Sequence, residues 1–209
     1  MSTRALVLVD LQNDFMPGGA LAVPRGHEVV PIANQLQASF DLVVATQDWH
    51  PPGHASFADA HPGHAAGEVL QLDGLDQILW PTHCVQETSG AALHQDLDLA
   101  RVARVFHKGT DPTLDSYSAF FDNAHRRATG LGDYLAAEGV DEVFVLGLAL
   151  DYCVKFSALD ARHLGLQTSL VLDACRAVEL QAGDGARAVE ELRAAGVQIV
   201  QSAQLLTPR

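Results

Sequence analysis

Short apolar runs alternate with segments of helical periodicity along most of this chain, and no other feature restricts its fold as strongly. Six runs have the length and apolar content of β-strands: residues 5–10, 41–48, 101–109, 141–150, 166–175 and 198–202. Four segments between them have helical spacing: residues 26–40, 130–140, 151–165 and 185–197. Alternating strands and helices form a parallel sheet that helices cover on both faces. We therefore predict an α/β fold, a three-layer α/β/α sandwich with a central, mostly parallel sheet.

The composition is typical of one compact domain that spans residues 1–209. The chain is 48% hydrophobic and shows no repeat, linker or low-complexity tract, although periodicity is weak between residues 49 and 90. With 26 acidic and 13 basic residues, the net charge of −13 disfavours binding to nucleic acid or to an anionic membrane surface. No apolar run is long enough to span a membrane, and Asp10 interrupts the N-terminal run before a signal peptide develops. We expect a cytoplasmic protein.

The three cysteines do not form a recognisable disulfide or zinc framework. Cys84, Cys153 and Cys175 are odd in number and widely spaced, and no C-x-x-C pair occurs. Taken one at a time, each is more typical of a small buried apolar residue than of a nucleophile.

Polar side chains end four of the predicted strands. Asp10 ends the first strand, Asp48 the second with His50 just after it, Lys108 the third, and Cys153 follows the fourth. Ligands of open parallel sheets bind beyond the carboxyl ends of the strands, near a switch in strand order. We therefore expect these side chains to meet at one edge of the sheet.

Cys153 has the position of a catalytic thiol, in the first turn of a predicted helix. Unpaired backbone N–H groups and the helix dipole favour a thiolate there and provide donors for an oxyanion. Asp10 is a candidate general base, and Asp14 competes with it for that role. Lys108 has the charge needed to keep both Asp10 and the thiolate ionised.

Histidines gather between residues 50 and 83. They are His50, His54, His61, His64 and His83. Asp48 and His50 point to the same side of an extended segment, and His83 belongs to a rigid turn, WPTHC. One carboxylate and two imidazoles suit Zn²⁺, Fe²⁺ or Mn²⁺. The role of His54 is open, while the remaining two histidines are typical of a solvated loop rich in Gly and Pro.

Five motifs together resemble the nicotinamidases, which belong to the isochorismatase-like hydrolase superfamily. In order along the chain they are VDLQNDF (9–15), TQDWHP (46–51), LWPTHCVQ (79–86), FHKGTDPTLDSYSAF (106–120) and GLALDYCV (147–154). The resemblance implies an isochorismatase-like three-layer fold. It also implies hydrolysis of nicotinamide to nicotinic acid and ammonia in NAD salvage, and activity on pyrazinamide-like analogues.

The resemblance also implies roles for individual residues. The catalytic triad is Asp10, Lys108 and Cys153. The backbone N–H groups of Ala149 and Cys153 form the oxyanion hole, after a cis peptide bond between Leu148 and Ala149. In the implied reaction Asp10 deprotonates Cys153, the thiolate attacks the carboxamide carbon, ammonia leaves, and water hydrolyses the thioester.

For the metal, the resemblance implies that one divalent ion, Zn, Fe or Mn, is bound by Asp48, His50 and His83 and orients the pyridine ring. His54 matches a histidine that some members use as a ligand or hold in the outer shell. No organic cofactor is implied. The ring then lies between aromatic side chains, which are expected to be Phe15 and Trp80 with Tyr117 close by.

Other readings of these motifs remain open. Another isochorismatase-like amidase, acting on a carbamoyl or ureido substrate, shares the triad, but its substrate has no ring nitrogen for the metal. Isochorismatase activity itself is a less favoured reading, because that activity does not need Cys153. Two further classes are a metal-hydroxide hydrolase with an inert Cys153 and a binding protein without a reactive thiol. A small-molecule substrate is expected in each enzymatic case, and the chain is a possible homo-oligomer.

Overall fold

Six parallel strands form the centre of the molecule in a computed structural model that describes residues 3–206. They are β1 (Thr3–Val9), β2 (Leu42–Asp48), β5 (Val102–Lys108), β6 (Val140–Leu148), β7 (Gln167–Arg176) and β8 (Gln198–Val200). Their order across the sheet is β5-β2-β1-β6-β7-β8, and every neighbouring pair is parallel. The predicted three-layer α/β fold is confirmed.

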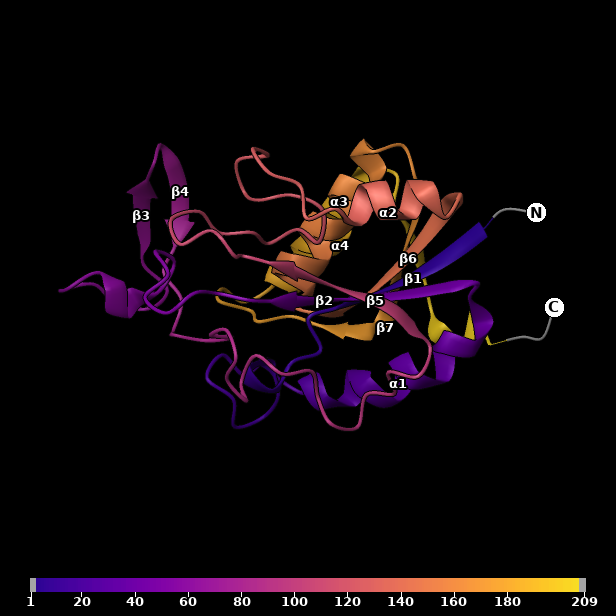
Figure 1. Cartoon of the computed structure of the whole chain (residues 1–209), viewed down its shortest axis with the longest axis horizontal. Helices are drawn as coiled ribbons and strands as arrows, with labels where there is room; N and C mark the ends of the chain where they lie inside the picture. The colour runs from indigo at the N-terminus through magenta and orange to yellow at the C-terminus, as the bar shows by residue number, and fades with distance from the viewer. Residues whose placement is uncertain (1–2, 207–209) are drawn as a thin grey trace.

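Helices cover both faces of this sheet (Figure 1). They are α1 (Val29–Leu36), α2 (Leu131–Ala137), α3 (Lys155–His163) and α4 (Asp184–Ala194). In Figure 1, α1 lies on one side of the sheet, and α2, α3 and α4 lie on the other. The predicted helix at 26–40 accommodates Pro31 because this residue falls in the first turn of α1, where backbone N–H groups have no intrahelical partner.

A two-stranded hairpin, which the sequence analysis did not predict, lies within the segment of weak periodicity. It consists of β3 (Val69–Leu72) and β4 (Leu75–Ile78), paired antiparallel and set apart from the main sheet in Figure 1. Asp73 and Gly74 join the strands with φ values of 50° and 81°. This Asp-Gly pair is a strong hairpin signal in any sequence, because both turn residues need positive φ.

The strand order explains where the side chains of the site meet. The chain first adds β2 and then β5 on one side of β1. It then crosses over and adds β6, β7 and β8 in turn on the other side of β1. A crevice forms at such a switch point, beyond the carboxyl ends of the two central strands. Asp10 follows β1 and Cys153 follows β6, so the crevice lies between them.

Gly147 allows β6 to approach β1 closely at this point. Its φ is +131°, and a Cβ atom there would lie 2.1 Å from the carbonyl oxygen of Val9. Only glycine fits such a close backbone approach. The close contact between the two central strands therefore depends on a residue without a side chain.

Candidate active site

Asp10, Lys108 and Cys153 come together in the buried crevice. Nζ of Lys108 lies 2.9 Å from Oδ2 of Asp10 and 3.4 Å from Sγ of Cys153. A carboxylate oxygen of Asp10 also lies within 4.8 Å of that sulfur. The three residues are 0%, 2% and 7% exposed, so their charges interact with little screening by solvent. The structure thus places a thiol, a carboxylate and an ammonium in mutual contact.

The two carboxylate oxygens of Asp10 have different partners, the Thr46 hydroxyl for Oδ1 and the Lys108 ammonium for Oδ2. The Thr46 hydroxyl donates to Oδ1 at 2.6 Å and accepts from the Asp10 backbone N–H at 3.2 Å. Oδ2 pairs with Lys108 but makes no aligned hydrogen bond within residues 3–206. Burial raises the pKa of Asp10 to about 6, against the opposing effect of Lys108. A carboxylate with this pKa is suited to take a proton from a thiol near neutral pH.

Asp14, the competing candidate for the base, has a different function. Its Oδ2 accepts the backbone N–H of Cys84 at 2.7 Å, and its Oδ1 accepts that of Ala20 at 3.3 Å. No hydrogen bond or ion pair joins Asp14 to Lys108 or Cys153 within the described residues. Asp14 therefore secures the turn next to His83, and Asp10 is the residue in position to act as a base.

Lys108 remains positively charged and Cys153 carries its proton at rest. Burial alone would lower the pKa of Lys108, but the carboxylates of Asp10 and Asp48 hold it well above its usual value. Nζ donates to Asp48 and to the carbonyl oxygen of Ser116 at 3.0 Å. Burial raises the pKa of Cys153, with Lys108 acting in the opposite direction. The thiol therefore needs a base, which is the role predicted for Asp10.

The backbone around Cys153 departs from a regular strand-to-helix junction. The peptide bond between Leu148 and Ala149 is cis, as the resemblance implied. Residues Leu150–Val154 form a single π-helical turn that leads into α3. Ala149 and Cys153 both line the same pocket. The two residues predicted to form the oxyanion hole therefore lie at the same pocket.

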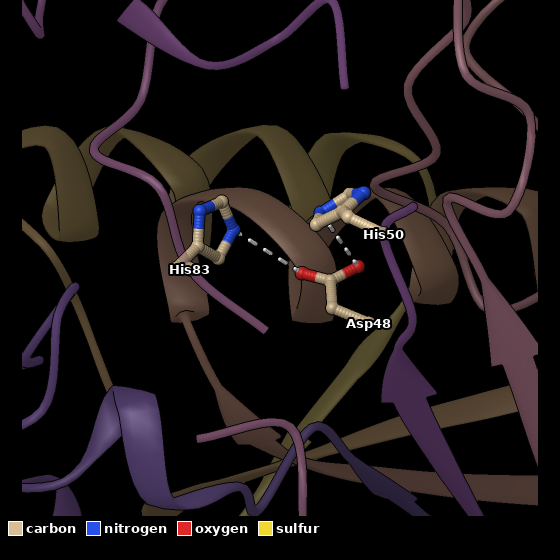
Figure 2. A group of neighbouring side chains, drawn as sticks. All are labelled: Asp48, His50 and His83. Carbon is tan, nitrogen blue, oxygen red and sulfur yellow. Dashed lines mark ion pairs between the residues drawn. The ribbon is translucent and has the colours of Figure 1, made fainter. Parts of the chain in front are cut away.

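Asp48, His50 and His83 form a second cluster of side chains (Figure 2). One ligand atom from each lies within 4.8 Å of the others, and each Nε2 is 3.8 Å from an oxygen of Asp48. Nδ1 of His50 is 3.0 Å from the carbonyl oxygen of Gly109, and Nδ1 of His83 is 2.7 Å from that of Pro81. Because a carbonyl oxygen only accepts, each Nδ1 carries the proton and each Nε2 is free to bind a metal.

The charge states of this cluster also fit a metal site. Burial lowers the pKa of His50 to about 4, so its imidazole is neutral, as a ligand must be. Burial opposes ionisation of Asp48, but the ammonium of Lys108 holds its pKa below the usual range. One carboxylate and two neutral imidazoles are the donor set that Zn²⁺, Fe²⁺ and Mn²⁺ accept. The predicted ligand residues are therefore brought together in a chemically suitable state.

His54 lies beside this cluster, and its tautomer can be assigned. The backbone N–H of Ser56 donates to Nδ1 at 3.1 Å, so the proton of the neutral ring is on Nε2. Nε2 is buried and has no partner among residues 3–206. His61 and His64 lie in the neighbouring loop, where they contact Ala55 and Glu68 instead.

The thiol and the histidine cluster line one aromatic pocket. The predicted residues Phe15, Trp80 and Tyr117 all line it. Trp80 Nε1 donates to the Tyr117 hydroxyl at 3.1 Å, and their rings meet edge to face. The pocket also includes residues that the sequence analysis did not select: Leu21, Asp115, Tyr152 and Val178. Tyr152 and Asp115 lie within the quoted motifs, whereas the other two lie outside them.

Comparison with known proteins gives consistent matches over nearly the whole chain. A family model described as the isochorismatase domain matches residues 4–204. The chain is 52% identical to a nicotinamidase of Escherichia coli, over 95% of this chain and 95% of that protein.

Two solved structures are similar in fold and in sequence. A nicotinamidase/pyrazinamidase of Acinetobacter baumanii superposes with a TM-score of 0.95 at 43% identity, over 98% of this chain and 99% of that one. A zinc complex of a pyrazinamidase from Pyrococcus horikoshii superposes with a TM-score of 0.77 at 38% identity, over 95% and 98% of the two chains.

Proposed function

The chain belongs to the isochorismatase family, and we propose that it hydrolyses nicotinamide to nicotinic acid and ammonia. One observation carries this proposal: a buried thiol and a carboxylate-histidine cluster line the same aromatic pocket. A flat heteroaromatic amide has one group for each of them, a carboxamide for the thiol and a ring nitrogen for a metal. The reaction supplies nicotinic acid for NAD salvage, as the names of the similar enzymes suggest.

The three catalytic residues have distinct roles in the proposed reaction. Asp10 takes the proton from Cys153, and the sulfur attacks the carboxamide carbon to form a tetrahedral intermediate. Asp10 returns the proton to the nitrogen, the C–N bond breaks, and ammonia leaves an acyl thioester. Water, deprotonated by Asp10, then attacks the thioester, and nicotinic acid leaves as the thiol is restored. Lys108 keeps its positive charge throughout and stabilises the anionic states of both partners.

The oxyanion of the tetrahedral intermediate is bound by backbone N–H groups in this proposal. Ala149 and Cys153 supply them, and both residues line the pocket beside the sulfur. Donors of this kind are fixed before the reaction begins, so they need no reorganisation as charge develops on the oxygen.

We propose that Asp48, His50 and His83 hold one divalent metal ion. When bound, the ion acts as a Lewis acid that holds the ring nitrogen and so orients the carboxamide. Zinc is present in the related Pyrococcus structure, and Fe²⁺ and Mn²⁺ suit the same donors. His54 is assigned a place outside the ligand set, because its free nitrogen carries a proton. No organic cofactor is part of the proposal.

Phe15, Trp80 and Tyr117 form the walls that hold the ring. The contact between Trp80 and Tyr117 fixes two of these walls relative to each other. Pyrazinamide differs from nicotinamide by one ring nitrogen in place of a C–H group, so the same walls accommodate it. Activity on pyrazinamide is therefore expected, and two of the similar structures are described as pyrazinamidases. A carbamoyl or ureido amide is not favoured by these relatives.

We further propose that residues 1–209 act as one hydrolase domain in the cytoplasm, on a free small molecule. The net charge of −13 disfavours binding to nucleic acid and to anionic membrane surfaces. Homo-oligomer formation stays a prediction. Within residues 3–206, none of the helices has the length and apolar character required to cross a bilayer.

The direct test is ammonia release by the metal-loaded protein from nicotinamide, pyrazinamide and a panel of carbamoyl and ureido amides. We expect release from the first two and little from the panel. Release from the carbamoyl compounds alone would show that the alternative substrate class is correct.

A further inference from the structure

Asp151 is a buried carboxylate for which the proposed reaction has no role. It is 4% exposed and lies in the π-helical turn Leu150–Val154 that also carries the thiol. Oδ1 accepts the backbone N–H of Val178 and Oδ2 accepts that of Glu179, each at 2.9 Å. Within residues 3–206 the carboxylate forms no ion pair and caps no helix. Both of its oxygens therefore hold one segment that is distant in the sequence.

The segment that Asp151 holds belongs to the connection between β7 and α4, residues 177–183, which contains no helix or strand. The N–H groups of Val178 and Glu179 donate to no backbone carbonyl in the described chain, so Asp151 supplies their acceptors. The carboxylate of Glu179 in turn accepts the N–H of Gly183 at 2.6 Å, just before α4 begins. Hydrogen bonds from N–H groups to a carboxylate are among the stronger ones in proteins. The position of this connection therefore depends on Asp151.

Val178 is the residue of this connection that reaches the aromatic pocket. It lines the pocket together with Ala149 and Cys153. Asp151 thus joins the turn that carries the thiol to an aliphatic wall of the same pocket. An apolar pocket distinguishes substrates that differ by one carbon atom by about 10- to 200-fold, so the position of such a wall affects which rings are accepted.

We propose that Asp151 is a positioning residue that fixes Val178 beside the nucleophile and so limits the size of the ring that the pocket accepts. This inference rests on the proposed function and adds to it a preference for heteroaromatic amides without ring substituents. Without the two hydrogen bonds, residues 177–183 are released, the ring is held less tightly, and larger rings enter. Asp151 has no hydrogen bond or ion pair to Asp10 or Lys108 within the described residues, so the chemical step depends on it less than ring binding does.

The test compares Asp151→Asn with wild type on nicotinamide and on nicotinamides that carry a methyl group at each free ring carbon. Asparagine keeps the size of the side chain but replaces one oxygen with an NH₂ group, which cannot accept from a backbone N–H. We expect KM for nicotinamide to rise about 10-fold, while kcat changes by less than about threefold. For at least one methylated ring, kcat/KM relative to nicotinamide should rise about 10-fold.

Asp160→Asn is the matched control for this change. Asp160 is a carboxylate of α3 that is 8% exposed and absent from the lining of the aromatic pocket. Its KM and its selectivity should stay within about twofold of wild type. If Asp151→Asn instead lowers kcat as much as kcat/KM and keeps the wild-type selectivity, Asp151 acts on the thiol alone and the inference is wrong. Unchanged kinetic constants in Asp151→Asn would overturn it as well.

Two further measurements keep the inference testable if Asp151→Asn does not fold. Val178→Ala should relax the selectivity against methylated rings and Val178→Ile should sharpen it, because the first removes aliphatic volume and the second adds it. In wild type, the amide hydrogens of Val178 and Glu179 should exchange more slowly than those of Leu180 and Ala182, which have no acceptor in the described chain. Unaltered selectivity in both Val178 variants, or equal exchange at the four amides, would contradict the inference.

Hydrogen exchange also separates this inference from the proposed function, because it needs no substrate. Absence of ammonia release from nicotinamide by the metal-loaded wild type would refute the proposed function. Slow exchange at Val178 and Glu179 would still show that Asp151 holds the wall of the pocket.

Discussion

Asp10 and Asp48 are two buried carboxylates beside the same ammonium, yet their pKa values move in opposite directions. Burial dominates for Asp10 and raises its pKa to about 6, while Thr46 and Lys108 oppose the rise. For Asp48 the ammonium of Lys108 outweighs burial and holds the pKa below its usual range. Two carboxylates whose environments separate their pKa values in this way are suited to different roles. Asp10 can exchange a proton near neutral pH, and Asp48 stays ionised, as its proposed role as a metal ligand requires.

The first prediction concerns the nucleophile. Cys153→Ala removes the attacking sulfur, so kcat for nicotinamide should fall by about 10⁴-fold or more. Initial rates of ammonia release, measured with the metal content matched, check this. Cys175→Ala is the matched control, because Cys175 is equally buried but lies in β7 and is absent from the pocket lining. It should keep its activity and lose about 1 kcal/mol of stability. Near wild-type turnover by Cys153→Ala would favour a metal-hydroxide mechanism.

The second prediction concerns the pH dependence of kcat/KM. The ionised form of Asp10 is the active base, so the rate should rise with pH through about 6 and level off above it. Thr46→Val removes a hydrogen bond that favours the ionised form, and the rising limb should move to higher pH. Thr46→Ser retains the hydroxyl and should restore the wild-type profile. If all three proteins share one profile, Asp10 is not the titrating base.

At the scale of elements, the strand-to-turn junctions determine the site. Four of the six parallel strands, β1, β2, β5 and β6, each deliver one reactive side chain, and the junction after β6 also provides the turn that carries Ala149 and Cys153. Gly147 holds this junction against β1, since its Cα lies too close to Val9 for any side chain. The distance between Asp10 and Cys153 therefore depends on how closely β6 packs against β1.

Gly147→Ala tests that dependence. A Cβ atom would push β6 away from β1, so we expect a loss of about 1–3 kcal/mol in the free energy of unfolding, together with a large loss of kcat. Gly139→Ala is the control, because Gly139 also has positive φ, +68°, but has open space around it. It should lose about 1 kcal/mol and keep its activity. Urea unfolding and ammonia release measure both effects; equal activity in the two variants would contradict this role for Gly147.

At the scale of the whole molecule, the proposed metal site connects segments that are far apart in the sequence. His50 follows β2, whereas His83 lies beyond the β3–β4 hairpin in the turn that Asp14 secures. An ion bound there joins these segments only in the folded state. Its binding free energy is then added to the stability of the fold.

Removing the metal should therefore lower both stability and activity. Dialysis against a chelator should abolish turnover and lower the melting temperature, and Zn²⁺ or Mn²⁺ should restore both. At a free metal concentration of 100 times Kd the ion contributes about 2.7 kcal/mol. Calorimetry with and without metal measures this difference. His64→Gln, an exposed change in the neighbouring loop, should respond to metal as wild type does. Full activity after verified metal removal would refute the assigned role of the ion.

The sequence by itself determined the fold class and most of the candidate site. Apolar periodicity and turn residues are local properties, and they were sufficient to place all six strands of the sheet. Asp10, Asp48, Lys108 and Cys153 converge because parallel strands align their carboxyl ends, a rule that needs only the strand boundaries. The Asp-Gly turn of the β3–β4 hairpin was equally local, but the surrounding weak periodicity obscured it.

Only the tertiary structure decided what depends on contacts between distant segments. In the sequence, Asp10 and Asp14 are both candidates for the general base. The structure distinguishes them, because Asp14 accepts a hydrogen bond from the backbone N–H of Cys84 while Asp10 pairs with Lys108. The buried Nε2 of His54, which has no partner among residues 3–206, is likewise visible only once its neighbours are known. Burial and charge pairing set protonation states, and both arise from segments that the chain brings together only on folding.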